Sequence, residues 1–134
     1  LSVLKEYDVI VPRHHLQYGE SDCDSGFWMT EQLLQSPNRP DAVICANNYI
    51  AYGCVNALKE NMIRIPEDMG VLTFDDFPFS RILDRKLTVV DIDVYDMGLP
   101  AGKLIRIKMK KPNLQMQFYC TLPSITVRGS TAGE

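Results

Sequence analysis

The stretch DAVICANNYIAYGCVNALKENMIRIPEDMGVLTFDD, residues 41–76, decides the fold that the sequence predicts. Its ends, 41–46 and 69–74, are short apolar runs of the kind that a strand buried on both faces requires. Between them the sequence predicts a helix that is capped by Asn47 or Asn48. The inner face of this helix is formed by apolar residues at helical spacing: Ile50, Ala51, Cys54 and Leu58. Two strands joined by a helix and short loops favour a parallel α/β unit with a right-handed crossover.

Upstream of this unit the sequence predicts a helix, a strand and a second helix. Residues 1–8 carry apolar side chains at helical spacing, and a short strand is expected over 15–18, from His15 to Tyr18. The second helix, at 24–35, follows Ser21 and Asp24, which have the spacing of a capping box. Its apolar stripe consists of Phe27, Thr30, Leu33 and Leu34.

Downstream, the alternation of strands and helices continues. A strand is expected over 87–92, followed by a helix whose apolar stripe is Met97, Ala101, Leu104, Ile105 and Met109. Because proline lacks an amide donor and crowds the preceding turn, we expect this helix to begin late or to bend at Pro100. Two short strands, 117–122 and 124–127, complete the chain. The predicted fold class is α/β, a doubly wound, mostly parallel sheet with helices on both faces.

Size, composition and charge fit a globular domain and give no sign of a polyanionic partner. The chain has 134 residues, of which 46% are apolar and 23% charged, and its net charge is -3. The one dense basic run, Lys108, Lys110 and Lys111, is interpreted as the solvated end of a helix. The opening LSVLKEYD contains no initiator Met, no signal peptide and no membrane span, so we interpret the chain as a fragment of a cytoplasmic protein.

The cysteines and histidines do not form a metal-binding pattern. The four cysteines, Cys23, Cys45, Cys54 and Cys120, include no C-x-x-C pair, and no His lies at zinc-finger spacing from them. Buried free thiols are therefore expected, as in a reducing compartment. His14 and His15 are adjacent and cannot easily share a ligand. We expect neither a metal nor a cofactor.

Small and polar residues follow the ends of the three predicted central strands: Gly19-Glu20-Ser21, Asn47-Asn48 and Asp75-Asp76. In an open parallel sheet the ligand crevice lies at the carboxyl ends of the strands. Carboxylate and amide groups there could bind the vicinal hydroxyls of a sugar. Two alternatives remain open, since Asn47 could simply cap its helix and Asp75 with Asp76 could be ordinary turn residues. No nucleophile-base motif or phosphate-binding loop occurs, so an enzyme is not expected.

Four segments together resemble a known family. CANNYIAYG at 45–53 resembles its A-N-D-x-x-A-x-G, and IPEDMGVLTFDD at 65–76 resembles its V-P-x-D-V-x-V-x-G-[FY]-D-[DN]. LTVVDIDVYDMG at 87–98 resembles its L-T-T-V-x(6)-M-G, and LPSITVRGST at 122–131 its terminal L-x-x-R-x-S-T. DSGF at 24–27 lies where the family has S-G-[FY]. In order and spacing these segments resemble the C-terminal half of the LacI/GalR family of bacterial transcription regulators.

The resemblance implies a periplasmic-binding-protein-like core of type I, built from two α/β subdomains that close on a small effector, often a sugar, a sugar phosphate or a purine. It implies that 1–87 form one subdomain, that 88–117 belong to the other, absent subdomain, and that 118–134 return to the first. Operator DNA would be bound only through an N-terminal helix-turn-helix outside this chain. The implied function is that of a transcription regulator, specifically a repressor that acts as a homodimer. The alternative is a sugar-binding transport protein of the same fold.

The resemblance also assigns roles to individual residues. Asn47 and Asp75 match effector-contacting positions of the family, and Ser21 lies where many members place an aromatic side chain that stacks on the ligand. Asn48 replaces the usual Asp, and Thr73 replaces the usual Gly. Family dimers meet through the helix after A-N-D and the loop after D-[DN], which implies a dimer interface formed by Tyr52, Phe79 and Ile82.

Overall fold

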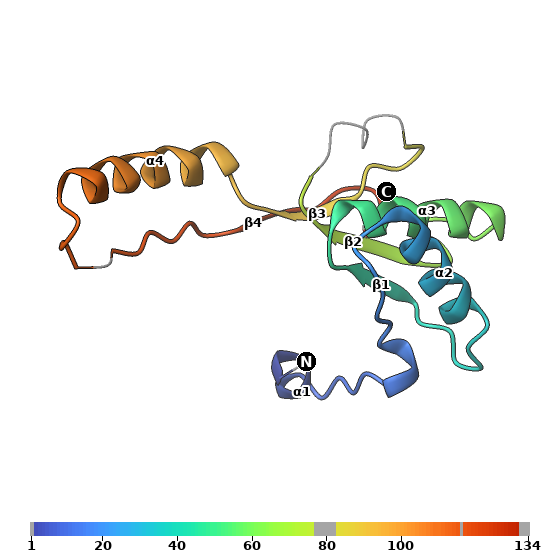
Figure 1. The fold of residues 1–134 in the computed structure, drawn as a ribbon. Coiled ribbons are helices and arrows are strands. Elements are labelled where there is room, and N and C mark those ends of the chain that lie inside the picture. Colours follow the sequence, from blue (N-terminus) through green and yellow to red (C-terminus); the bar gives the residue numbers. More distant parts are fainter. Residues whose placement is uncertain (1, 77–82, 116, 132–134) are drawn as a thin grey trace.

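The computed structural model describes residues 2–76, 83–115 and 117–131, and it contains a four-stranded sheet with helices beside it (Figure 1). The helices are α1 (Ser2–Glu6), α2 (Cys23–Leu34), α3 (Asn48–Glu60) and α4 (Val94–Lys110), with a short 3-10 helix, η1 (Arg13–His15). The strands are β1 (Ala42–Cys45), β2 (Gly70–Phe74), β3 (Thr88–Asp91) and β4 (Ser124–Thr126). The predicted strand, helix and strand of residues 41–76 are confirmed.

The strand order is β1-β2-β3-β4, and the first three strands run parallel. Cys45 pairs with Thr73, and Thr73 pairs with Val89, so the carboxyl ends of these strands lie at one edge of the sheet. β4 is antiparallel to β3. The mostly parallel α/β sheet that the sequence predicts is therefore confirmed, with one antiparallel strand at its edge.

The core lies between α3 and one face of the sheet. Residues of α3 and of the strands meet there and are fully or almost fully buried: Ala51, Cys54, Leu58, Val71 and Val89. On the opposite face Ile44 is 67% exposed, because burial in β1 alternates from residue to residue. The prediction that β1 is buried on both faces is therefore wrong for this chain.

Two glycines allow α2 to pack closely against α3. A Cβ atom on Gly53 would lie 2.0 Å from the carbonyl oxygen of Cys23, and one on Gly26 would lie 2.3 Å from that of Ile50. Near the other end of the helix pair, the Asn61 side chain donates a hydrogen bond to Glu31. Since early residues of α2 meet early residues of α3 and late ones meet late ones, the two helices begin at the same end of the sheet.

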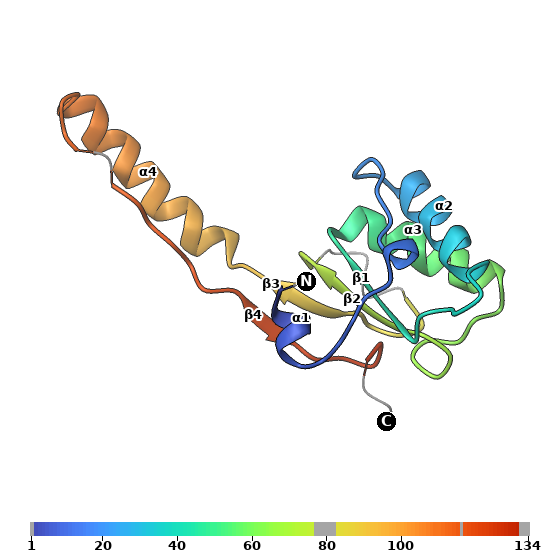
Figure 2. The ribbon, with the colours of Figure 1, turned by 90° about the horizontal axis from the view of Figure 1, so that it is seen from below.

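Several predicted elements before and after the core are corrected. Residues 15–18 form no strand, because η1 ends at His15 and the chain then continues without a ladder partner. No strand forms over 117–122 either, because this segment returns beside α4, away from the sheet (Figures 1 and 2). The helix α4 begins before Pro100 and continues through it, since the Asp93 side chain caps its first turn by accepting from Tyr95 and Asp96 amides.

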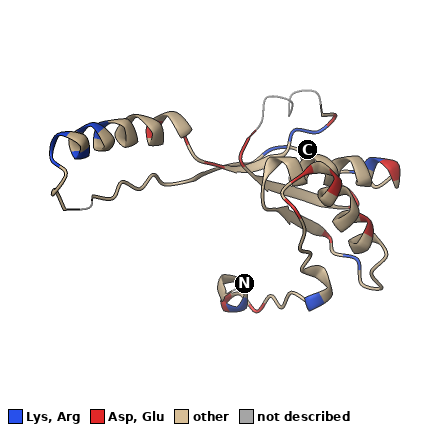
Figure 3. Ribbon diagram, in the orientation of Figure 1, with Lys and Arg blue, Asp and Glu red and all other residues tan. Residues whose placement is uncertain are grey.

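The helix α4 extends away from the sheet, and both views show it far from α2 and α3 (Figures 1 and 2). None of its residues is buried within the described chain, and Ile105 and Met109 of its apolar stripe are 62% and 78% exposed. Lys and Arg residues are concentrated toward its carboxyl end, as the blue parts of the ribbon in Figure 3 show, which agrees with the predicted solvated helix end. Among the described residues no helix has the length and apolar character needed to cross a membrane.

Candidate functional site

Asn47 and Asp75 lie at the same edge of the sheet. Asn47 comes two residues after Cys45 of β1, and Asp75 comes two residues after Thr73 of β2. Cys45 and Thr73 are in register, so the two side chains follow the strands at the same level. Asp75 is exposed and Asn47 is half-buried, so neither side chain is enclosed in the core. Ser21 precedes α2 at the end where α2 and α3 both begin, and it is exposed. The fold thus brings the three predicted effector residues to one edge of the sheet.

Asn47 is the N-cap of α3. Its backbone is extended, and its Oδ1 accepts a hydrogen bond from the Ile50 amide at 2.9 Å. The capping alternative is therefore confirmed for Asn47. Capping occupies the side-chain oxygen, so the side-chain amide nitrogen is the group that could donate a hydrogen bond to a ligand.

The N-cap of α2 is Asp22, not Ser21. The Asp22 carboxylate accepts a hydrogen bond from the Ser25 amide at 2.8 Å, and this bond lowers the pKa of Asp22 from its ordinary value. The predicted capping box over Ser21 and Asp24 is therefore wrong by one residue. Asp22 and Ser25 have the same three-residue spacing, and a carboxylate suits the positive end of a helix dipole.

Asp75 has a backbone conformation that few residues other than glycine adopt. Its φ is 64°, in the left-handed region, where Asp and Asn are tolerated better than most residues. Its amide donates a hydrogen bond to the Val90 carbonyl at 3.0 Å, which continues the pairing of β2 with β3. The turn alternative is therefore consistent with the structure, and the turn presents the Asp75 carboxylate to solvent.

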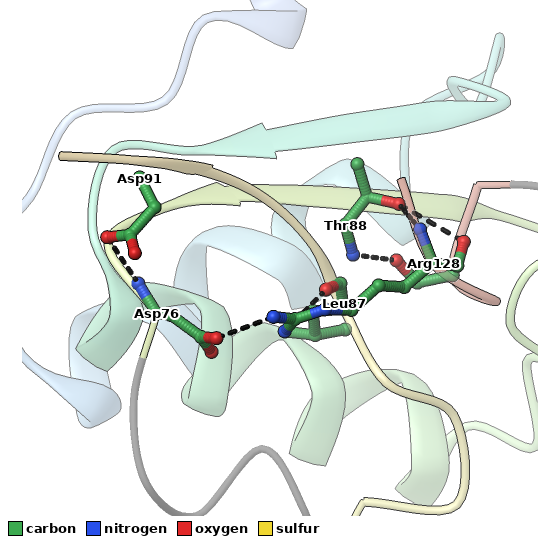
Figure 4. Close-up of polar contacts among 6 residues, drawn as sticks. Asp76, Leu87, Thr88, Asp91 and Arg128 are labelled. Carbon is green, nitrogen blue, oxygen red and sulfur yellow. Dashed lines mark hydrogen bonds and ion pairs between the residues drawn. The ribbon is translucent and has the colours of Figure 1, made fainter. Parts of the chain in front are cut away.

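Beside this turn lies an ion pair that the sequence analysis did not identify. Arg128 Nη2 donates to Asp76 Oδ2 at 2.6 Å, and Arg128 Nη1 donates to the Leu87 carbonyl at 3.3 Å (Figure 4). The hydrogen bond with Asp76 raises the pKa of the Arg128 guanidinium. The Asp76 amide in turn donates to Asp91 Oδ1 at 3.5 Å. The only signal in the sequence was the Arg of the terminal VRGST motif.

The segment that carries Arg128 is fixed between β2 and β3. The buried Ser130 hydroxyl donates to the Val71 carbonyl at 2.5 Å and accepts from the Thr88 amide at 2.7 Å. Thr88 Oγ1 accepts from the Arg128 amide at 2.9 Å and lies 2.6 Å from Thr131 Oγ1. Residues 128–131 therefore join neighbouring strands through side-chain hydrogen bonds.

Of the residues predicted at a dimer interface, only Tyr52 lies within the described chain. It is on the outer side of α3 and is 46% exposed, as the predicted helix faces require. Phe79 and Ile82 lie outside the described residues. Tyr49, three residues before Tyr52 and so on a neighbouring part of the helix surface, is exposed as well.

The thiols are free, and two of them fit the prediction of burial. Cys45 and Cys54 are buried, Cys23 is intermediate, and Cys120 is exposed, so the prediction is wrong for Cys120. A hydrogen bond with the Cys54 thiol and, after it, burial raise the pKa of Cys45. Residues 2–76, 83–115 and 117–131 contain no cluster of His, Cys, Asp and Glu that could hold a metal ion.

A parallel sheet with polar groups at its carboxyl edge is typical of α/β domains that bind small ligands. The sequence matches the family described as periplasmic binding protein-like domain over residues 4–131. The chain therefore belongs to the periplasmic binding protein-like domain family.

Curated relatives of this chain are transcription regulators rather than enzymes. The probable HTH-type transcriptional repressor ExuR of Bacillus subtilis (strain 168) is 35% identical over 130 residues, which are 97% of this chain and 39% of the relative. The ribose operon repressor of Escherichia coli (strain K12) is 27% identical over 129 residues, or 96% of this chain and 39% of the relative. The chain thus spans well under half the length of these relatives.

Solved structures agree with the fold. A putative transcriptional regulator LacI from Bacillus cereus subsp. cytotoxis NVH 391-98 matches with a TM-score of 0.92 at 22% identity, over 99% of this chain and 47% of that one. A LacI family transcriptional regulator from Lactobacillus casei, solved with bound sucrose, matches with a TM-score of 0.80 at 25% identity, over 97% and 48%. The predicted resemblance to LacI-family regulators and the predicted fold are confirmed.

Proposed function

We propose that this chain is the effector-sensing and dimerisation part of a LacI/GalR-type repressor that responds to a sugar or a similar small polar ligand. The observation that carries the proposal is the placement of Asn47 and Asp75 at one carboxyl edge of the sheet, in a domain related to repressors. The regulator is cytoplasmic, has no catalytic activity, and binds operator DNA through a helix-turn-helix outside this chain.

The effector contacts would come from Asn47, Asp75 and Ser21. The exposed Asp75 carboxylate can accept hydrogen bonds from two neighbouring hydroxyls of a sugar, and the Asn47 side-chain nitrogen can donate one. These residues form one wall only. Small-molecule sites bury most of their ligand, so the second wall must come from another subdomain, and this chain alone should bind sugars more weakly than about micromolar.

Calorimetric titration of the intact regulator with ribose and with sucrose tests the site, since relatives are named for or solved with these sugars. Asn47→Asp keeps an oxygen to cap α3 but removes the donor nitrogen, so affinity should fall about tenfold while the melting temperature holds. Asp75→Asn should weaken binding at least as much. Sugar affinities that are unchanged in both variants would contradict the site, and micromolar binding by the chain alone would contradict the missing wall.

We also propose that Tyr52, Phe79 and Ile82 form the contact between two copies of the regulator. The support from the described residues is the exposed Tyr52 on the outer side of α3, and a symmetric contact there would be self-complementary. In the intact regulator, Tyr52→Asp should shift the mass measured by light scattering from dimer toward monomer. Tyr7→Asp, the same change at an exposed tyrosine outside α3, is the matched control. An unaltered dimer in Tyr52→Asp would argue against this interface.

The division of the chain into 1–87, 88–117 and 118–134 is likewise proposed. The extended position of α4, with no residue buried, supports assigning the α4 part of 88–117 to a second subdomain, whereas β3 at the start of that range pairs with β2 in the sheet described here. In this proposal the chain would leave the first subdomain after β3 and return to it at β4, and the antiparallel pairing of these two strands supports that path.

A further inference from the structure

The turn that carries Asp75 requires support from its neighbours. Asp75 has a φ of 64° and an exposed side chain, and its amide donates a hydrogen bond to the Val90 carbonyl of the neighbouring strand at 3.0 Å. A left-handed conformation is unfavourable for a residue with a Cβ atom and persists where the surrounding structure imposes it. The next residue, Asp76, continues the turn, and its amide donates a hydrogen bond to Asp91 Oδ1 at 3.5 Å.

Asp76 is held by Arg128 from the far end of the chain. The guanidinium donates to Asp76 Oδ2 at 2.6 Å and to the Leu87 carbonyl at 3.3 Å, so one side chain connects the second residue after β2 to the residue before β3 (Figure 4). The backbone of Arg128 is itself fixed, since its amide donates to Thr88 Oγ1 at 2.9 Å. The two side chains are 22% and 31% exposed, so the pair is less screened than a surface ion pair.

We propose that Arg128 is a positioning residue for the effector site. This proposal rests on the proposed function of Asp75 as an effector contact. It acts through Asp76, which it holds in the orientation that keeps the Asp75 turn left-handed and its carboxylate directed to the edge of the sheet. The segment 128–131 follows β4, the strand on which the chain returns from α4. A shift of this returning segment would therefore move Arg128 and alter the effector contact.

Sugar titration of the intact regulator separates positioning from plain stabilisation. Arg128→Gln removes the charge and should weaken ribose or sucrose binding about tenfold or more, and Arg128→Lys, which retains the charge, should recover part of the loss. Arg64→Gln is the control, because Arg64 forms an ion pair of similar length, 2.8 Å, with Asp68 away from this edge. Its affinity should stay within about twofold of wild type. A lower melting temperature of Arg128→Gln with unchanged affinity would overturn the inference.

Hydrogen exchange at the Asp75 amide tests positioning without a sugar. In the wild type this amide is bonded to Val90, and Arg128→Gln should make it exchange severalfold faster, while Arg64→Gln should not. If the wild type binds neither sugar, the proposed function fails for these ligands and the exchange rates still decide the role of Arg128. An Asp75 exchange rate that is the same in wild type and Arg128→Gln would overturn the inference even if binding is lost.

Discussion

The sheet with α2 and α3 differs from the α4 segment in how far its apolar side chains are buried. Around the sheet, residues of α3, β2 and β3 bury one another almost completely, and two glycines allow the helices to touch. In α4 an apolar stripe of similar character is exposed apart from the half-buried Leu104, and a Cβ atom added at Gly98 or Gly102 would meet nothing within 4 Å. The same helical spacing of apolar residues therefore produces a packed core beside the sheet and an uncovered surface on α4. What differs is the presence of a partner element.

The largest expected effect is at the contact between α2 and α3. Gly53→Ala places a Cβ atom 2.0 Å from the Cys23 carbonyl oxygen and 2.6 Å from the Phe27 amide nitrogen. Both are backbone atoms, so a helix must shift, and the free energy of unfolding should fall by about 3 kcal/mol or more. Gly102→Ala in α4 is the matched control and should raise it slightly, by about 0.5–1 kcal/mol, because alanine favours helix. Urea unfolding followed by circular dichroism measures both, and equal effects would contradict the comparison.

The next effect concerns the exposed stripe of α4. Burying such side chains is worth about 1.5–3 kcal/mol each, so the chain on its own should associate with a second copy through Leu104 and Ile105. The double variant Leu104→Glu, Ile105→Glu should then be monomeric by light scattering at a concentration where the original chain is not. If the original chain and the double variant both have the mass of a monomer, this association is ruled out.

A smaller effect is expected at the N-cap of α3. Asn47→Ala removes the oxygen that accepts the Ile50 amide and should lower the free energy of unfolding by about 0.5–2 kcal/mol. Asn47→Asp keeps the acceptor and should have the stability of the wild type or a slightly higher one, because a carboxylate suits a helix N-terminus. Thermal unfolding of the two variants gives the comparison. A loss of equal size in both would mean that capping by residue 47 does not matter.

The sequence predicted correctly those features that depend on the spacing of apolar residues within one element. It failed for features that depend on contacts with residues far away in the chain. The helix faces of α3 were correct, since Ala51, Cys54 and Leu58 are buried and Tyr52 is exposed. The two-sided burial of β1 was wrong, because an apolar run does not reveal whether a second layer covers the sheet.

The same reason explains what was missed at the site. Register between parallel strands follows from their ends, so Asn47 and Asp75 could be placed at one edge in advance. The partnership of Arg128 with Asp76 joins residues 52 positions apart, and no local pattern predicts it. The cap of α2 was misplaced by one residue because Ser21, Asp22 and Asp24 all have side chains that favour a helix start.

The smallest effect is a dependence of stability on acid at the start of α2. The Ser25 amide stabilises the charged form of Asp22, so the pKa of Asp22 is lower in the folded chain than the roughly 3.9 of an unfolded chain. A group whose pKa is lowered by folding contributes stability above its unfolded pKa, and that contribution is lost as pH falls through the folded value. Asp22→Asn can still cap the helix but cannot titrate, so wild type should exceed it in free energy of unfolding near pH 6, with the difference shrinking below about pH 4. Urea unfolding at a series of pH values measures this difference. A constant difference across the series would show that the Asp22 carboxylate does not couple to folding.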